Sequence, residues 1–246
     1  MTDRRPLIKE IEDLLQTNLE YVQNLLTIQR LMQNDARVTF FKHINIVLDS
    51  ASTSLILAHK YLDPHGQWWN DIQMEYNRSR RSIYSAFPLV RHKMQLKYFD
   101  QTVMNGFFFF IFSSFEHSSR LICKQYNLQL FQTQKKYGIS ALWKGMTIDL
   151  CLKKRDKFID LITCLRNSFH NNGVFIPSGG VTSRKIVWNN TTYTFNENQP
   201  IKDSKRDMWL SFVPISREIT NFFESIISSD PVKKFSYYVD PTEPIG

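Results

Sequence analysis

Residues 106–115 read GFFFFIFSSF and form the most hydrophobic stretch of the chain. In the surrounding segment, residues 98–126, apolar side chains fall on almost every face of a helix rather than on one stripe. That distribution is typical of a helix at the centre of a bundle. The apolar run lasts only about ten residues before Glu116, whereas a membrane-spanning helix needs about 20. The stretch therefore predicts a buried helix, and we expect no association with a membrane.

Apolar residues recur at the spacing of an amphipathic helix on both sides of this stretch. Pro6 stands where it suits the first turn of a helix, and the spacing after it predicts an N-terminal helix that ends near Gln33. Three later helices are expected at residues 38–62, 148–169 and about 205–228.

The segments between these helices differ in their pattern of apolar and polar residues. Residues 136–146, KYGISALWKGM, are expected to form a loop with a short turn. After Gly173, residues 184–188 and 192–195 alternate apolar and polar side chains around an Asn-Asn pair. Alternation around a two-residue turn predicts a β-hairpin, here at about residues 181–197.

The expected fold is all-α. It is a single antiparallel helical bundle over residues 1–230, with the small β-hairpin inserted before the last helix. No internal repeat or low-complexity linker divides the chain. Residues 231–246 contain three prolines and are expected to form an extended C-terminal tail.

The net charge and the cysteines indicate the kind of partner and the compartment of the protein. The 246 residues carry a formal net charge of +8, which fits a polyanionic partner such as RNA, DNA or a membrane surface. The three cysteines, Cys123, Cys151 and Cys164, lack CxxC spacing and are interpreted as reduced thiols of a core. The N-terminus has no apolar core of a secretion signal. We therefore expect a cytoplasmic protein.

The sequence contains none of the common cofactor motifs. Its histidines have no metal-ligand spacing with one another or with cysteine, and a glycine-rich phosphate loop and a nucleophile elbow are both lacking. We expect no metal and no cofactor, and the pattern argues against an NTPase or an α/β hydrolase.

Residues 165–173 read LRNSFHNNG and carry the strongest candidate site. Arg166 and His170 are one turn apart, on the stripe beside the apolar face of the expected helix. This position predicts that the two side chains lie near each other at a solvent-reachable groove lined by the helix of residues 98–126. A cation near a helix C-terminus and Gly173 after two asparagines are typical of helix termination. The alternative is that the two side chains form a catalytic pair for breaking phosphodiester bonds.

A metal-free ribonuclease needs such a pair. One group takes a proton from the ribose 2′-OH or gives one to the leaving 5′-oxygen, and histidine suits either role near neutral pH. A second group stabilises negative charge that builds on the phosphate, and the guanidinium of arginine does so without losing its own proton.

The stretch LRNSFHNNG resembles the signature of HEPN domains, in which an Arg, often followed by Asn, precedes a His on one helix. Residues 107–122, FFFFIFSSFEHSSRLI, resemble the preceding long HEPN helix, which often carries an acidic or polar residue facing that pair. The resemblance implies catalytic roles for Arg166, Asn167 and His170, with Glu116 as the upstream acidic residue. It also implies an all-α bundle and frequent dimerisation.

Active HEPN members cleave RNA without metal, in toxin–antitoxin, abortive-infection and other antiviral defence systems. We therefore expect a metal-independent endoribonuclease, a toxin or antiphage effector that works as a homodimer, with a cognate antitoxin or other partner protein. Only three residues separate Arg166 from His170, fewer than in the usual motif. The alternative is a non-catalytic HEPN-like module that binds RNA, nucleotide or a protein partner.

Two further interpretations stay open. Glu116 either pairs with Arg120, four residues on, or orients Arg166 or His170 from the neighbouring helix. Residues 68–81, WWNDIQMEYNRSRR, mix aromatic and basic side chains in a way that suits stacking on unpaired bases. The alternative is an amphipathic helix with a solvated basic face. The candidate nucleic-acid-binding residues are Arg78, Arg80, Arg81 and Asn171.

Overall fold

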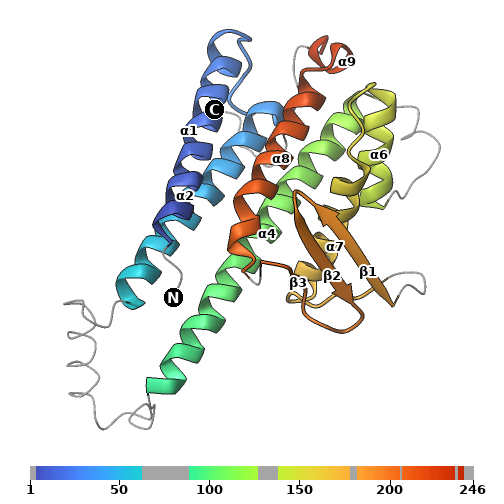
Figure 1. Cartoon of the computed structure of the whole chain (residues 1–246). Coiled ribbons are helices and arrows are strands. Elements are labelled where there is room, and N and C mark those ends of the chain that lie inside the picture. Colours follow the sequence, from blue (N-terminus) through green and yellow to red (C-terminus); the bar gives the residue numbers. More distant parts are fainter. Residues whose placement is uncertain are drawn as a thin grey trace.

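The computed structural model describes residues 4–62, 89–126, 138–177, 182–205, 207–235 and 238–240. Its helices are α1 (Arg5–Thr27), α2 (Ala36–Leu62), α4 (Leu89–Tyr126), α6 (Ile139–Asp149), α7 (Asp156–His170), α8 (Trp209–Ile227) and α9 (Asp230–Lys233), and its strands are β1 (Ser183–Trp188), β2 (Thr191–Asn196) and β3 (Lys202–Asp203) (Figure 1). The described part is mostly helical, with a small antiparallel sheet between α7 and α8, as the sequence predicted.

The apolar stretch lies in α4, at the centre of the helices. α4 packs against α2, α6, α7 and α8, and its rings at Phe108, Phe112 and Phe115 are fully buried. Phe108 stacks on Phe169 of α7, with 4.8 Å between ring centroids and 6° between ring planes. The prediction of a central buried helix is confirmed. No helix in the described part of the chain is long and apolar enough to cross a membrane.

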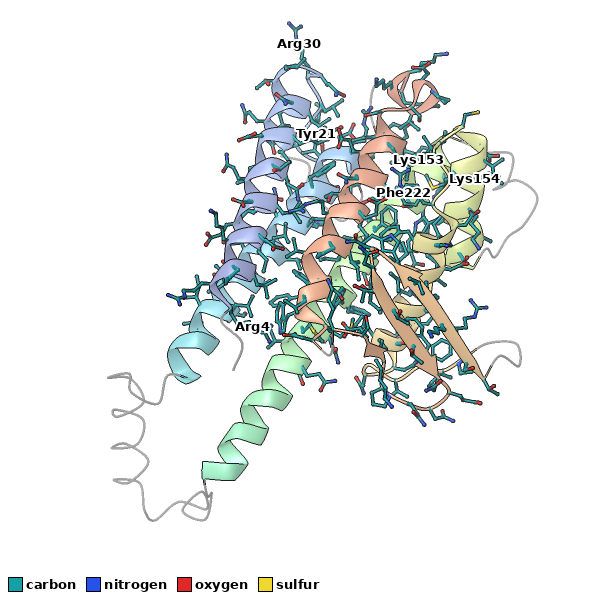
Figure 2. All side chains as sticks on the ribbon, in the orientation of Figure 1. Arg4, Tyr21, Arg30, Lys153, Lys154 and Phe222 are labelled. Carbon is teal, nitrogen blue, oxygen red and sulfur yellow. The ribbon has the colours of Figure 1, made fainter. Side chains whose placement is uncertain are left out.

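α1 and α2 lie side by side and form one edge of the bundle (Figure 1). α1 ends earlier than the expected position near Gln33. The backbone of Arg30 is left-handed, with φ 54°, and the amide of Leu31 donates to the Leu25 carbonyl at 3.0 Å. This hydrogen bond closes the helix end in the manner of a C-cap. Figure 2 shows Arg30 at the exposed end of α1, whereas Phe222 of α8 is buried.

The expectation of a loop at residues 136–146 was wrong. Most of that segment belongs to α6, where Leu142, Trp143 and Met146 are buried at helical spacing. The prediction of one helix from residue 148 was wrong as well, because the chain turns at Cys151. That residue has a left-handed φ of 51°, and α7 begins only at Asp156.

The cysteine interpretation holds for two of the three residues. Cys123 and Cys164 are buried, whereas Cys151 is exposed in the turn after α6. Burial raises the pKa of the Cys123 thiol to about 12. The expectation of three core thiols was therefore wrong for Cys151, because a left-handed turn residue between two helices is displaced from the core.

The predicted β-hairpin is present as β1 and β2. Asn189 and Asn190 both have positive φ, 45° and 56°, and Trp188 pairs with Thr191 across them. A two-residue turn with two left-handed residues matches the twist of a hairpin. A third strand, β3, was not predicted. The hairpin packs on α7, where the ring centroids of Phe158 and Trp188 are 5.1 Å apart.

The C-terminal segment differs from the expected extended tail. Residues 230–233 form the short helix α9, and Tyr238 and Asp240 are buried. The segment returns to the start of α2, where the amide of Ala36 donates to the Tyr238 carbonyl at 2.7 Å. Burial of these two side chains offsets the conformational entropy that the segment loses when it is ordered.

Candidate functional site

The candidate site begins at the C-terminal end of α7. The helix ends at His170, one residue beyond the expected end at residue 169, and the Ser168 carbonyl accepts the amides of Asn171 and Gly173, both at 2.9 Å. Asn172 and Gly173 have positive φ, 55° and 82°. A glycine in this left-handed position is a common helix stop. The stop leaves His170 on the last turn, exposed at the surface.

Glu116 of α4 binds two arginines at once. Its Oε2 accepts from Nη2 of Arg166 at 2.9 Å, and its Oε1 accepts from Nε of Arg120 at 3.0 Å. Both interpretations of Glu116 therefore hold together: it pairs within its own helix and also holds Arg166 from the neighbouring one. The carboxylate is a bridge between α4 and α7.

The guanidinium of Arg166 keeps donor capacity beyond this pair. Its Nη1 donates to Oδ1 of Asn167 at 3.3 Å. Its Nε is buried and has no hydrogen-bond partner in the described part of the chain. The side chain is 28% exposed. Arg166 is therefore oriented by α4 and its own helix while part of it faces solvent.

His170 lies beside this bridge, on the same stripe of α7. Its ring meets Phe109 of α4 edge-on, with 4.7 Å between centroids. Although the residue is exposed overall, this packing partly desolvates the ring and lowers its pKa below the ordinary 6.5. Repulsion from Arg166 lowers the pKa further, and attraction to Glu116 opposes both effects. The imidazole is therefore predominantly neutral at pH 7.

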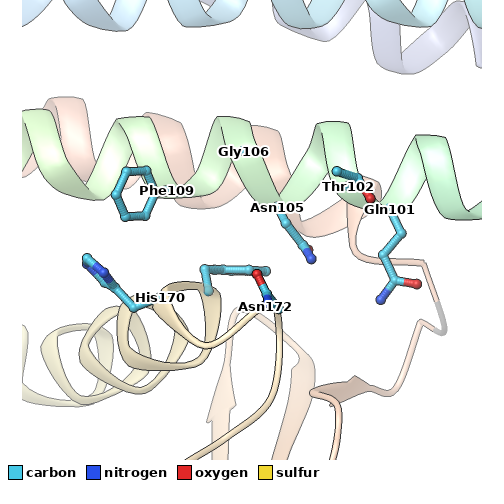
Figure 3. A pocket seen from close by; sticks show the side chains of 8 residues that line it. Gln101, Thr102, Asn105, Gly106, Phe109, His170 and Asn172 are labelled. Atoms are coloured by element: carbon cyan, nitrogen blue, oxygen red, sulfur yellow. The ribbon is translucent and has the colours of Figure 1, made fainter.

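A pocket of about 600 Å³ opens next to His170. Figure 3 shows side chains of α4 facing the end of α7 across it. Three amide side chains and two phenylalanine rings share the wall with a glycine and a threonine. The lining residues are Gln101, Thr102, Asn105, Gly106, Phe109, Phe169, His170 and Asn172. His170 is the single ionisable side chain in this described lining.

The four candidate nucleic-acid-binding residues do not gather at this site in the described part of the chain. Asn171 donates from its amide to the Asn167 carbonyl at 2.7 Å, so this predicted nucleic-acid-binding residue caps its own helix. Arg78, Arg80 and Arg81 lie outside the described residues. Within the described ranges, no three His, Cys, Asp or Glu side chains gather as a metal site would require.

Sequence reasoning predicted a groove lined by the helix of residues 98–126 beside His170, but it did not name the residues of the wall. The pocket lining includes Asn105, Gly106 and Phe109 of that helix. One signal was present, since Gly106 interrupts the interior of an otherwise strongly apolar helix. A glycine in such a place has a packing or functional reason.

The site brings together Arg166, Asn167, His170 and Glu116, from two helices that run antiparallel at this point. Comparisons with protein-family models, with curated proteins and with solved structures find no match to the chain. The function is therefore inferred from the chemistry of these residues.

Proposed function

We propose that the protein is a metal-independent endoribonuclease of the HEPN type, a toxin or antiphage-defence effector, in which Arg166 and His170 act on the phosphodiester of RNA. The observation that carries the proposal is the Glu116 carboxylate, which holds Arg166 at 2.9 Å beside a histidine with a lowered pKa. An oriented cation next to a neutral imidazole at a surface pocket is the minimum that this chemistry needs.

The roles follow from the two side chains. Neutral His170 takes the proton from a ribose 2′-OH, and the 2′-oxygen attacks the adjacent phosphorus. The bond to the 5′-oxygen breaks, and that oxygen takes up a proton as it leaves. The products are a 2′,3′-cyclic phosphate and a 5′-hydroxyl. Arg166 stabilises the negative charge that builds on the phosphate oxygens.

A homodimer fits this division of roles. One imidazole starts neutral and serves as the base, and a second, from another copy of the chain, starts in the protonated form and gives its proton to the leaving oxygen. The exposed position of His170 at the end of α7 leaves it accessible to such a copy. A two-fold axis beside this helix end brings two Arg–His pairs to one phosphate.

The test is cleavage of a mixed-sequence RNA in excess EDTA, with analysis of the end groups. We expect 2′,3′-cyclic phosphate ends and no cleavage of the same sequence made as DNA, which lacks the 2′-OH. His170→Ala should lose about 10²–10⁴-fold in rate, and Arg166→Ala about 10²–10³-fold. The matched control is Arg217→Ala, an exposed arginine of α8, which should retain the wild-type rate.

Equal cleavage of DNA, or a folded His170→Ala variant with the wild-type rate, contradicts the mechanism. Sedimentation or light scattering at micromolar concentration tests the dimer separately. A strictly monomeric protein that still cleaves RNA removes the shared site and leaves the pair of one chain to do the chemistry.

One observation favours the second candidate, a non-catalytic module that binds RNA, nucleotide or a protein partner. The charge of Arg166 is already balanced by Glu116, and Arg166 is not part of the pocket lining. Wild-type protein that binds RNA with strong salt dependence and never cleaves it decides for this alternative.

A further inference from the structure

Gly106 occupies a position that the packing of the protein does not explain. It lies inside α4, where glycine weakens a helix relative to alanine because it has more conformational freedom to lose. A glycine in a packed helix usually makes room for a neighbouring chain. Here a Cβ atom built on Gly106 meets no described atom within 4 Å. The missing side chain instead enlarges the pocket beside His170.

Asn105, the preceding residue, also lines this pocket and carries an unsatisfied polar atom. Its Oδ1 is buried and has no hydrogen-bond partner in the described part of the chain. Its amide packs against Gly173, where a Cβ atom would lie 3.2 Å from Nδ2. Gly106 therefore leaves the pocket wider, Gly173 leaves room for the Asn105 side chain, and the buried Oδ1 of Asn105 has no donor among the described residues. Such an atom is costly to bury unless a ligand supplies the donor.

We propose that this pocket binds the base of a nucleotide next to the scissile phosphate, an inference that rests on the proposed function. Gln101, Asn105 and Asn172 carry amides, which offer a donor and an acceptor as the hydrogen-bonding edge of a base does. Phe109 supplies an aromatic ring for a base to contact. Among the described residues, the lining contains no carboxylate and no permanently charged cation, so it suits a neutral heteroaromatic ring better than a phosphate.

The position of the pocket supports the same ligand. His170 lines the pocket and also lies one helical turn from Arg166, so their Cβ atoms are about 5–6 Å apart. A base in the pocket therefore places its own phosphate within reach of the guanidinium. A volume of about 600 Å³ falls within the usual range of small-molecule sites.

The test is a titration of the wild-type protein with AMP, CMP, GMP and UMP, followed by NMR or calorimetry. Ribose 5-phosphate, which lacks a base, serves as the comparison. We expect at least one mononucleotide to bind about tenfold or more tightly than ribose 5-phosphate. Gly106→Leu fills the pocket from an open position and should weaken that binding about tenfold or more, while Gly106→Ala should stay within about threefold.

Asn105→Ala provides a second variant, and Asn221→Ala on the exposed side of α8 provides its matched control. Asn105→Ala should weaken binding of the preferred nucleotide, and the control should not. If circular dichroism shows that Gly106→Leu does not fold, the mononucleotide affinity of Asn105→Ala tests the proposal instead. Failure of every mononucleotide to bind better than ribose 5-phosphate overturns the proposal, as does wild-type binding by a folded pocket variant.

The two proposals fail in different ways. Protein that binds a mononucleotide through the pocket but never cleaves RNA retains the base site and loses the nuclease. The opposite outcome is that the wild-type protein cleaves RNA and that a folded Gly106→Leu variant cleaves it with the same base preference. This result retains the nuclease and overturns the base site.

Discussion

Two arginine–carboxylate pairs of this protein have opposite surroundings. Arg37 binds Asp35 through two hydrogen bonds, Nε to Oδ1 at 2.8 Å and Nη2 to Oδ2 at 2.7 Å. The two side chains are 3% and 0% exposed. The same Asp35 accepts the amide of Tyr238, and the Arg37 guanidinium lies over the Tyr238 ring. We call these three residues the C-terminal latch, because they fasten the end of the described chain to α2.

The pair of Arg166 and Glu116 is arranged more openly. A single hydrogen bond joins them, the side chains are 28% and 17% exposed, and Nε of Arg166 has no partner in the described part of the chain. The latch uses both oxygens of Asp35 and several donors of Arg37 within the fold, whereas the α4–α7 pair retains donors near a pocket. Two arginine–carboxylate pairs of one protein therefore differ in how many of the arginine's hydrogen bonds the fold itself uses: most of them at Arg37, fewer at Arg166.

The largest effect is expected at the latch. Asp35→Ala removes the carboxylate that accepts two hydrogen bonds from the buried Arg37 guanidinium, and breaking a buried pair in this way costs about 3–5 kcal/mol of unfolding free energy. Urea denaturation measures the loss. The control is Asp160→Ala, which breaks an exposed pair with Lys144 and should cost no more than about 1 kcal/mol. Equal losses in the two variants would show that the latch is no more important than a surface pair.

A smaller effect on stability and a distinct effect on activity are expected at Glu116. Glu116→Gln keeps the shape of the side chain and removes the charge that orients Arg166, so stability should fall by no more than about 1 kcal/mol. RNA cleavage should fall about tenfold or more, because the guanidinium is no longer held beside His170. Circular dichroism and cleavage rates are measured on the same preparations.

The matched control for this variant is Glu218→Gln. Glu218 accepts from Nε of Arg155 at 2.9 Å with similar exposure, but on α8 and outside the site. It should show the same small loss of stability with the wild-type cleavage rate. A loss of cleavage in both variants points to a general effect of weakened packing rather than to orientation of Arg166.

The smallest effect is expected from pH. Because the pKa of His170 is lowered from 6.5 in the folded protein, the unfolded chain binds this proton first as the pH falls. Stability associated with this group is therefore full above pH 6.5 and declines as the pH falls through the folded pKa. His170→Ala should lack this decline. In the wild-type protein, the acid limb of the cleavage rate should have its midpoint below 6.5, and a midpoint above 6.5 contradicts a desolvated base.

Several elements follow from local signals and were predicted correctly. The Asn-Asn turn of the hairpin requires two left-handed residues, and asparagine tolerates that conformation well. Gly173 marks the end of α7 for the same reason. The failures have a local cause too. Gly145 inside α6 obscured the helical pattern of that segment. Cys151 takes a left-handed conformation that cannot be predicted from its residue type.

The sequence by itself determined that Arg166 and His170 share one face of a helix beside its apolar stripe, because the 3.6-residue period places residues four apart together. Only the tertiary structure decided that Glu116, 50 residues away, meets that arginine, and that Asn105 and Gly106 form a pocket wall beside that histidine. The reason is that helical periodicity defines a face within one helix and carries no register between two. The antiparallel packing of α4 against α7, fixed by Phe108 stacked on Phe169, sets that register.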